Sequence, residues 1–391
     1  MIDIQILEKL NAPTAEQRLA NLKEVVKTTV FPPMVPQYIN NHIHTTYSFS
    51  PYSPTAAVFA ARMEGLCTAG IIDHDSIGGA KEFLQAAEII NMPVTIGMEC
   101  RASMDGTRLA DRRTNNPDQV GISYMTIQSV PHDKIDELNA FFAPYREARD
   151  RRNRAMVQNI NALLPNIGLD YDRDVLPLSQ AKDSGGVTER HLMYALAVKM
   201  VKTVGKGQKM ADHLSSIGLC LSEKQIAQML DTEYPFYEYD LLGILKGAFV
   251  PKIYIDAADE CPNVKEVAAL CERIDALLCY AYLGDVTASV TGDKKAQKFE
   301  DDYLEDVIAC IKECGIKAVT YMPTRNTPEQ LSRLRRLCDD NGLFQVSGED
   351  INSPRQSFVI RAMENPLFAN LIEATQKLIE HEKTGCAILG D

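Results

Sequence analysis

Apolar residues recur at helical spacing near the start of the chain, and a proline-rich segment, FPPMVP, follows them. The apolar positions are Ile6, Leu7, Leu10, Leu19, Leu22 and Val25. Spacings of three and four residues place such side chains on one face of a helix. The pattern predicts an amphipathic N-terminal helical extension over residues 1–40.

Short apolar runs then alternate with amphipathic stretches in two parts of the chain. The predicted strands are 38–44, 67–73, 93–99, 317–322 and 343–347, and the predicted helices are 54–63, 80–90, 304–313 and one opening at TPEQ. The last of these helices has Thr327 as N-cap, Pro328 at its first position and Gln330 to close a capping box. Alternation of this kind predicts a parallel sheet, open or closed into a barrel.

The middle of the chain, residues 133–291, has mostly helical patterns, as in FFAPYREARDRRNRAMVQNINALL and NVKEVAALCERIDALL. We interpret it as a largely helical insertion over one face of a barrel formed by residues 41–132 and 292–391. Within it, the arginine-rich run at 149–154 is expected to be a solvated helix face.

Composition narrows the functional classes. No apolar run approaches the roughly 18 residues that span a bilayer, and the first residues lack a signal-peptide pattern. The ten cysteines form no C-x-x-C pair, which fits reduced thiols and a cytoplasmic protein. The net charge of −12 argues against a broad nucleic-acid footprint but permits a small phosphorylated substrate. The sequence does not predict the oligomeric state.

Candidate ligands follow the predicted strands in succession. The first strand ends in His42 and His44, the second in His74-Asp75, the third at Glu99, and the last runs into Glu349-Asp350. Parallel strands bring their carboxyl ends to one edge of a sheet or one mouth of a barrel. Imidazoles and carboxylates there suit a divalent transition metal ion such as Zn, Mn or Fe.

These segments resemble the polymerase and histidinol phosphatase (PHP) family of metal-dependent phosphoesterases. The similar motifs are HIHTTYS, DHDSIGG at 73–79, GMEC at 97–100, TERHLMYAL around His191, and the closing segment through GEDIN. The resemblance implies an α/β fold, a distorted (βα)7 TIM-like barrel, with metals at its C-terminal mouth. It also implies hydrolysis of a phosphate ester.

Departures from the family pattern lower the expected number of metal ions. Further ligands are expected where this chain has Ser50, Ser123 or Tyr124, Tyr282 and Asn352. Serine, tyrosine and asparagine are weaker ligands than imidazole for such metals. The resemblance therefore implies one well-formed divalent metal site, held by His42, His44, Glu99 and Asp350, with His74 as a weaker ligand or substrate contact.

Other site residues are predicted with less direct support. His191 and Asp75 are candidates for proton transfer, although His191 could equally cap its helix. Arg101, Arg325 and Arg355 are candidates for binding the phosphate, against the alternative of solvated surface arginines.

Two alternative functions stay open at this stage. One is a PHP-like binding protein that has lost catalysis. The other is a one-metal hydrolase or lyase with a non-phosphate substrate.

Overall fold

A seven-stranded sheet curls into a nearly closed barrel in the computed structural model, which describes residues 3–286 and 298–388. The strands follow one another in chain order around the barrel. They are β1 Val35–Ile43, β2 Leu66–His74, β3 Val94–Ser103, β4 Ile122–Gln128, β5 Leu277–Ala281, β6 Ala318–Tyr321 and β7 Phe344–Ser347. A parallel bridge from Ile43 to Ile351, just after β7, joins the two edges. The predicted TIM-like barrel is confirmed.

One strand runs against the others. β4 pairs antiparallel with both β3 and β5, whereas β1–β3 and β5–β7 pair in parallel. A wholly parallel sheet was therefore the wrong expectation at this position. The physical reason is the connection 104–121, which has no helix, because a parallel pair needs a long crossover whereas an antiparallel pair does not.

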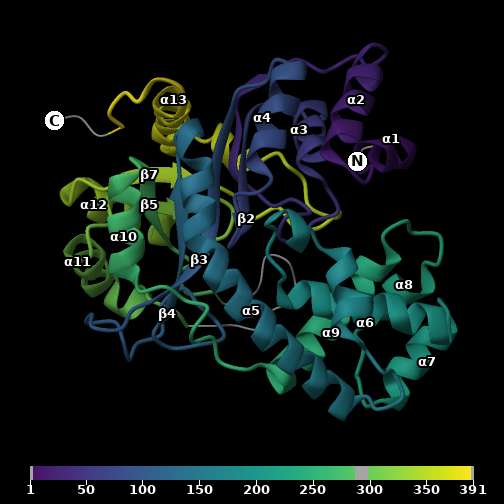
Figure 1. The fold of residues 1–391 in the computed structure, drawn as a ribbon. Helices are drawn as coiled ribbons and strands as arrows, with labels where there is room; N and C mark the ends of the chain where they lie inside the picture. The colour runs from purple at the N-terminus through teal and green to yellow at the C-terminus, as the bar shows by residue number, and fades with distance from the viewer. Residues whose placement is uncertain (1–2, 287–297, 389–391) are drawn as a thin grey trace.

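The barrel helices form an outer layer around these strands (Figure 1). They are α3 Pro54–Met63, α4 Ala80–Ile89, α10 Val264–Arg273, α11 Leu304–Glu313, α12 Pro328–Asp340 and α13 Ala369–Thr384. The capping box predicted at Thr327 and Gln330 opens α12.

The N-terminal extension forms two helices rather than one, α1 Ile4–Leu10 and α2 Ala15–Val26. The break falls where Thr14 caps α2 by accepting from the Gln17 N–H. A buried ion pair between Arg18 and Glu82, with Nη2 and Oε2 2.5 Å apart, fixes α2 against the barrel helix α4.

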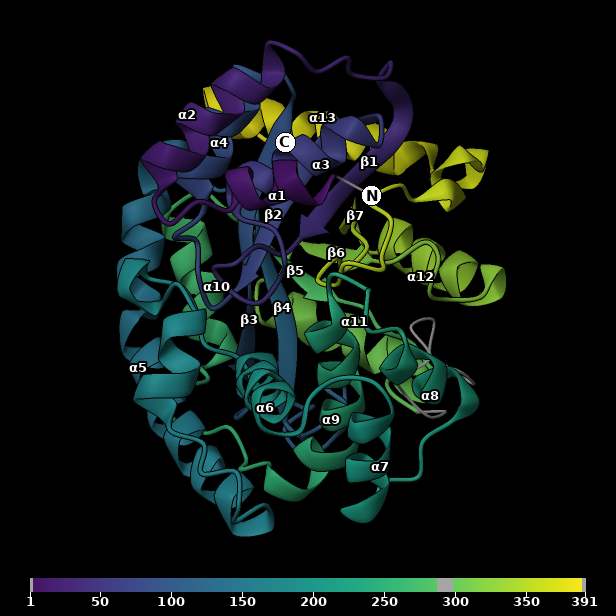
Figure 2. The ribbon, with the colours of Figure 1, turned by 90° about the vertical axis from the view of Figure 1, so that its right-hand side faces the viewer.

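A second group of helices lies beyond one end of the barrel, below the strands in Figure 2. It comprises α5 Ile135–Leu163, α6 Glu189–Val204, α7 Gln208–Ser216, α8 Glu223–Leu230 and α9 Tyr237–Ile253. These helices share a hydrophobic core distinct from the main core of the barrel, except that the first half of α5, with Ile135, Leu138 and Phe142, packs in the main core. The barrel also takes β5 and α10 from the 133–291 segment. Among the described residues, no helix combines the length and apolar character needed to cross a membrane.

Candidate metal centre

Five predicted ligands converge at the carboxyl ends of the parallel strands. His42 lies on β1, His74 ends β2 and Glu99 lies on β3, directly opposite His74 in the strand register. Glu99 Oε2 lies 3.3 Å from His42 Nε2, 3.7 Å from His44 Nε2 and 3.2 Å from His74 Nδ1. Asp350 approaches from beyond β7, with Oδ1 3.1 Å from His44 Nε2.

The inner imidazoles have the character of metal ligands. His42 and His44 are buried, at 7% and 0% exposure. In the described part of the chain, the Nε2 atoms of both rings are buried and have no hydrogen-bond partner. A buried polar atom without a partner is costly, and a metal ion bound between these nitrogens and the carboxylates would satisfy it. The residues present therefore fit a divalent ion.

A hydrogen-bonded chain behind His44 fixes its orientation. The Asp73 carboxylate accepts from the Thr45 N–H and hydroxyl and from the Ser48 hydroxyl, at 2.6–2.7 Å. Because Ser48 gives its only proton to Asp73, its oxygen accepts from His44 Nδ1–H, 3.1 Å away. In its neutral form, which is the form that binds a metal ion, the ring then keeps a lone pair on Nε2, facing the other ligands. Such outer contacts set the tautomer of metal-binding histidines.

Two overlapping sets of three residues could each hold an ion. One set is His42, His44 and Asp350, and the other is His44, His74 and Glu99. Both depend on His44, whose Nδ1 is engaged with Ser48. One imidazole nitrogen has one lone pair to offer, so two ions, one in each set, would compete for His44 Nε2. This favours one well-formed site over two.

The electrostatics of the cluster stabilise positive charge at its centre. Burial alone would raise the pKa of Glu99, but the imidazoles, His74 first, hold it below its ordinary value. Burial likewise opposes ionisation of Asp350, and His44 outweighs it, so the pKa of Asp350 lies well below its ordinary value. Burial lowers the pKa of His74 to about 4, which leaves the ring neutral and able to act as a ligand.

A cavity of about 190 Å³ opens onto these ligands. It is lined by His42, His74, Glu99, Asn115, Pro117, Asp118, Tyr124, Arg190, Lys246, Ala281, Tyr282, Leu283, Thr320, Tyr321, Met322, Gly348, Asp350 and Asn352. Its two cationic lining residues, Arg190 on α6 and Lys246 on α9, both come from the helical group. Sequence reasoning did not select Lys246, because nothing in the pattern of α9 relates it to a strand end.

Comparison with solved structures identifies the fold. A proposed metal-dependent phosphoesterase from Bifidobacterium adolescentis has a TM-score of 0.53 at 20% identity, covering 85% of this chain and 96% of its own. An amidohydrolase from Chromobacterium violaceum, solved with sulfate and no metal, has a TM-score of 0.53 at 15% identity, covering 86% and 96%. This chain shares their barrel fold. No family model and no curated protein sequence matches it.

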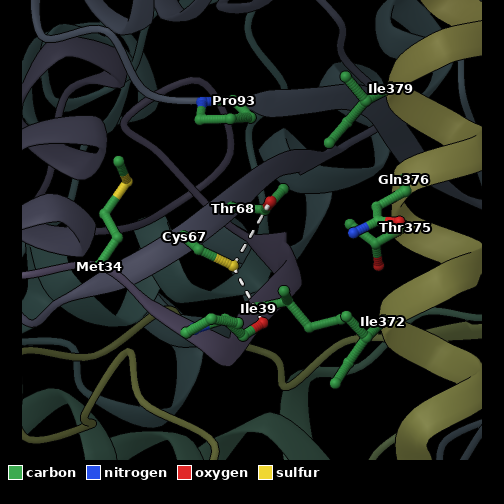
Figure 3. A pocket seen from close by; sticks show the side chains of 10 residues that line it. Met34, Ile39, Cys67, Thr68, Pro93, Ile372, Thr375, Gln376 and Ile379 are labelled. Carbon is green, nitrogen blue, oxygen red and sulfur yellow. Dashed lines mark hydrogen bonds between the residues drawn. The ribbon is translucent and has the colours of Figure 1, made fainter.

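A second cavity, of about 300 Å³, lies away from the candidate metal centre, between α13 and strands β1 and β2 (Figure 3). Its lining is apolar or uncharged, with Ile39, Ile372 and Ile379 facing the space and Cys67 donating to the Pro36 carbonyl at 3.2 Å. The histidines and carboxylates that could hold a metal ion lie at the other cavity instead.

None of the three arginines predicted to bind phosphate is among the residues that line the site cavity. Arg101 is buried and paired with Glu260. Arg355 forms a two-pronged ion pair with Asp240, at 2.7 and 2.8 Å. Arg325 donates from Nε to the Leu283 carbonyl at 2.9 Å. Their phosphate-binding role stays a prediction that their positions do not support.

Asp75 belongs to a buried ionic network that joins the barrel to the helical group. Asp75 pairs with Arg149, Arg149 and Arg152 pair with Glu189, and Arg152 continues through Glu260 to Arg101. Arg149 and Arg152 are 5% and 8% exposed. The expectation of a solvated face was therefore wrong for these two arginines. Their carboxylate partners lie 37–108 residues away along the chain, so local charge pattern could not reveal them.

His191 serves as a helix cap. It is the third residue of α6, and its Nδ1 accepts from the Thr188 N–H at 3.0 Å. Burial lowers the pKa of His191 to about 3. The neutral ring therefore has its proton on Nε2, and His191 is not among the residues that line the site cavity.

The residues that replace expected ligands are bonded to protein groups. The Ser123 and Thr114 hydroxyls are 2.6 Å apart, and the Tyr282 hydroxyl donates to Asp301 at 2.6 Å. Asn352 donates to Asp350 Oδ1 at 2.6 Å, which orients the carboxylate toward His44. These positions stabilise the surroundings of the site.

Proposed function

We propose that the chain is a metal-dependent phosphoesterase that hydrolyses a small phosphate ester with one divalent ion. The observation that carries the proposal is the convergence of two buried Nε2 atoms that make no hydrogen bond, on His42 and His44, with the Glu99 and Asp350 carboxylates at a cavity.

The proposed ligands are His42, His44, Glu99 and Asp350, with His74 beside them. A bound Zn, Mn or Fe ion supplies the polarisation of a phosphoryl oxygen and lowers the pKa of water toward neutrality. The chain itself holds the ligand set rigidly, through Ser48 behind His44.

The cavity suits a small anionic substrate. Its volume of about 190 Å³ is below the roughly 300–1,000 Å³ of pockets for drug-sized ligands. Arg190 and Lys246 bring positive charge to the wall, where a phosphate oxygen would accept from them. Arg190 also packs on the Phe49 ring, with its guanidinium carbon 5.4 Å from the ring centre, which limits its freedom.

A second candidate is a binding protein without turnover. The hydrogen bonds of Ser123, Tyr282 and Asn352 favour it, because these positions have structural partners where further ligands would stand. Hydrolysis separates the two candidates.

The test uses protein stripped with a chelator and reloaded with Zn, Mn or Fe in turn. Metal content and hydrolysis of a panel of phosphate monoesters and diesters are measured together. We expect about one tightly bound ion per chain and metal-dependent hydrolysis, both lost in His42→Ala. The matched control is His213→Ala on α7. A loaded enzyme that hydrolyses no ester, or equal losses in both variants, would contradict the proposal.

A further inference from the structure

Three tyrosines line the cavity of the metal centre, and their hydroxyls differ in what they contact. The Tyr282 hydroxyl donates to Asp301 at 2.6 Å, and the Tyr321 hydroxyl donates to Gln345 at 3.1 Å. The Tyr124 hydroxyl has no hydrogen bond within residues 3–286 and 298–388. Tyr124 is half-buried and lines the cavity, so its hydroxyl is available to an acceptor that enters there.

The register of β3 and β4 places Tyr124 on the same face of the sheet as the candidate ligand Glu99. Glu99 pairs with Thr126, and Arg101 pairs with Tyr124. Paired residues of antiparallel strands point to the same face, and so do residues two apart. Tyr124 therefore lies on the face of Glu99, one pair further toward the end of β3. Its ring centre is 6.3 Å from that of His74.

The backbone of Tyr124 is held in place by a single side chain. Asn115 accepts from the Tyr124 N–H and donates to the Tyr124 carbonyl, both at 2.8 Å. The same amide also donates to the Ala281 carbonyl on β5, at 2.6 Å. These bonds fix the backbone of β4 against β5, so the position from which the phenol projects is set before a ligand binds.

We propose that Tyr124 is a catalytic residue that contacts the substrate: its hydroxyl donates a hydrogen bond to an oxygen of the phosphate bound at the metal centre. The proposal rests on the proposed function and deepens it. The ligand chemistry it requires is an oxyanion with an acceptor oxygen directed toward β4, as a phosphate group provides. The phenol keeps its proton throughout, and no bond within Tyr124 is broken.

The experiment compares Tyr124→Phe with the wild-type protein, both loaded with the same metal. Inorganic phosphate is the probe, and its Kd is measured by calorimetry. A hydrogen bond to a charged group is typically strong, so we expect the variant to bind phosphate about 10- to 100-fold more weakly. The Kd for the metal and the Tm should change little, since the ring stays and the hydroxyl has no protein partner.

Tyr280→Phe is the matched control. Tyr280 lies on the neighbouring strand β5, is 1% exposed, and does not line the cavity. Its hydroxyl is buried without a partner in the described part of the chain, so its loss should leave phosphate affinity unchanged. A weaker Kd in Tyr124→Phe alone, with normal metal binding, supports the proposal.

Three results would overturn it. They are unchanged phosphate affinity in Tyr124→Phe, an equal loss in Tyr280→Phe, and no phosphate binding by metal-loaded wild-type protein. These results are separable from failure of the proposed function. A wild-type protein that binds metal and phosphate through Tyr124, yet hydrolyses no ester, would refute the phosphoesterase and leave the contact established.

Discussion

Replacing Ser48 with alanine should weaken metal binding although Ser48 is not itself a ligand. Ser48 accepts from His44 Nδ1 at 3.1 Å and donates to Asp73 at 2.6 Å. The substitution leaves the Nδ1–H of a ring with 0% exposure without its acceptor, and Asp73 loses one of its three donors. Both effects make the His44 ring more mobile and weaken its preference for the tautomer with the proton on Nδ1.

The expected size of the effect follows from comparable contacts behind metal ligands. Their loss typically weakens metal affinity by about 10- to 100-fold, which corresponds to about 1.4–2.7 kcal/mol. The stabilisation that a saturating ion gives to the folded state should fall by the same amount. In the absence of metal, the variant should also unfold at a lower temperature than a control serine variant, because a buried N–H and a buried carboxylate each lose a hydrogen-bond partner.

Ser50→Ala is that control, because it removes the same group two residues away. Ser50 is buried like Ser48, and its hydroxyl accepts from the Tyr52 N–H at 3.4 Å, with no contact to His44. Metal affinity is measured by competition with a chromophoric chelator, and thermal unfolding is measured with and without the ion. If Ser48→Ala binds the ion as tightly as the wild-type protein, or Ser50→Ala is equally weakened, the reasoning about the tautomer is refuted.

Three further predictions concern the surroundings of the site. Arg149→Met leaves Asp75 buried and unpaired and should lower the free energy of unfolding by about 3–5 kcal/mol in urea denaturation; a loss below about 1 kcal/mol would contradict it. Gly348→Ala places a Cβ 2.5 Å from the His42 Cβ. This substitution should lower the free energy of unfolding by about 1–3 kcal/mol and weaken metal binding in the chelator assay. Unchanged metal affinity would argue against this tight contact. Burial raises the pKa of Glu382 to about 7, above its unfolded value, so the folded state loses stability as the pH rises through 7. Glu382→Gln avoids that loss. The free energy of unfolding of this variant, relative to that of the wild type, should rise by about 2–3 kcal/mol as the pH goes from 5 to 8. A difference in thermal unfolding that does not depend on pH would refute this prediction.

The strands and helices of the barrel were predictable wherever the local pattern determines them. Helix α11 and helix α3 have the predicted bounds, because their apolar spacing and their boundary residues agree. The direction of β4 was not predictable from its own residues, because the apolar pattern of a strand is the same whether it pairs in parallel or antiparallel with its neighbours. The assignment of β5 to the barrel was also missed, because its five residues follow a long helical segment.

The candidate ligands were predictable for a different reason. His42, His74 and Glu99 each lie at the end of an apolar run. A barrel brings the carboxyl ends of its parallel strands together, and this does not depend on the conformation of the loops. The phosphate-binding arginines were not predictable in this way. An arginine beside a strand end is available to a substrate only if no carboxylate of the protein pairs with it. The carboxylate partners of Arg101 and Arg355 lie 159 and 115 residues away along the chain, so the local sequence does not reveal them.

The buried ionic network joins the end of the barrel to the helical group. The barrel contributes Asp75 and Arg101, which flank the ligands on β2 and β3, and the 133–291 segment contributes Arg149, Arg152, Glu189 and Glu260. The three acids and three bases balance only when both parts are present. Because an unpaired buried charge is strongly destabilising, a displaced helical group would leave charges uncompensated beside the candidate metal centre. The helices that bring Arg190 and Lys246 to the cavity are thus held there by charge as well as by apolar packing.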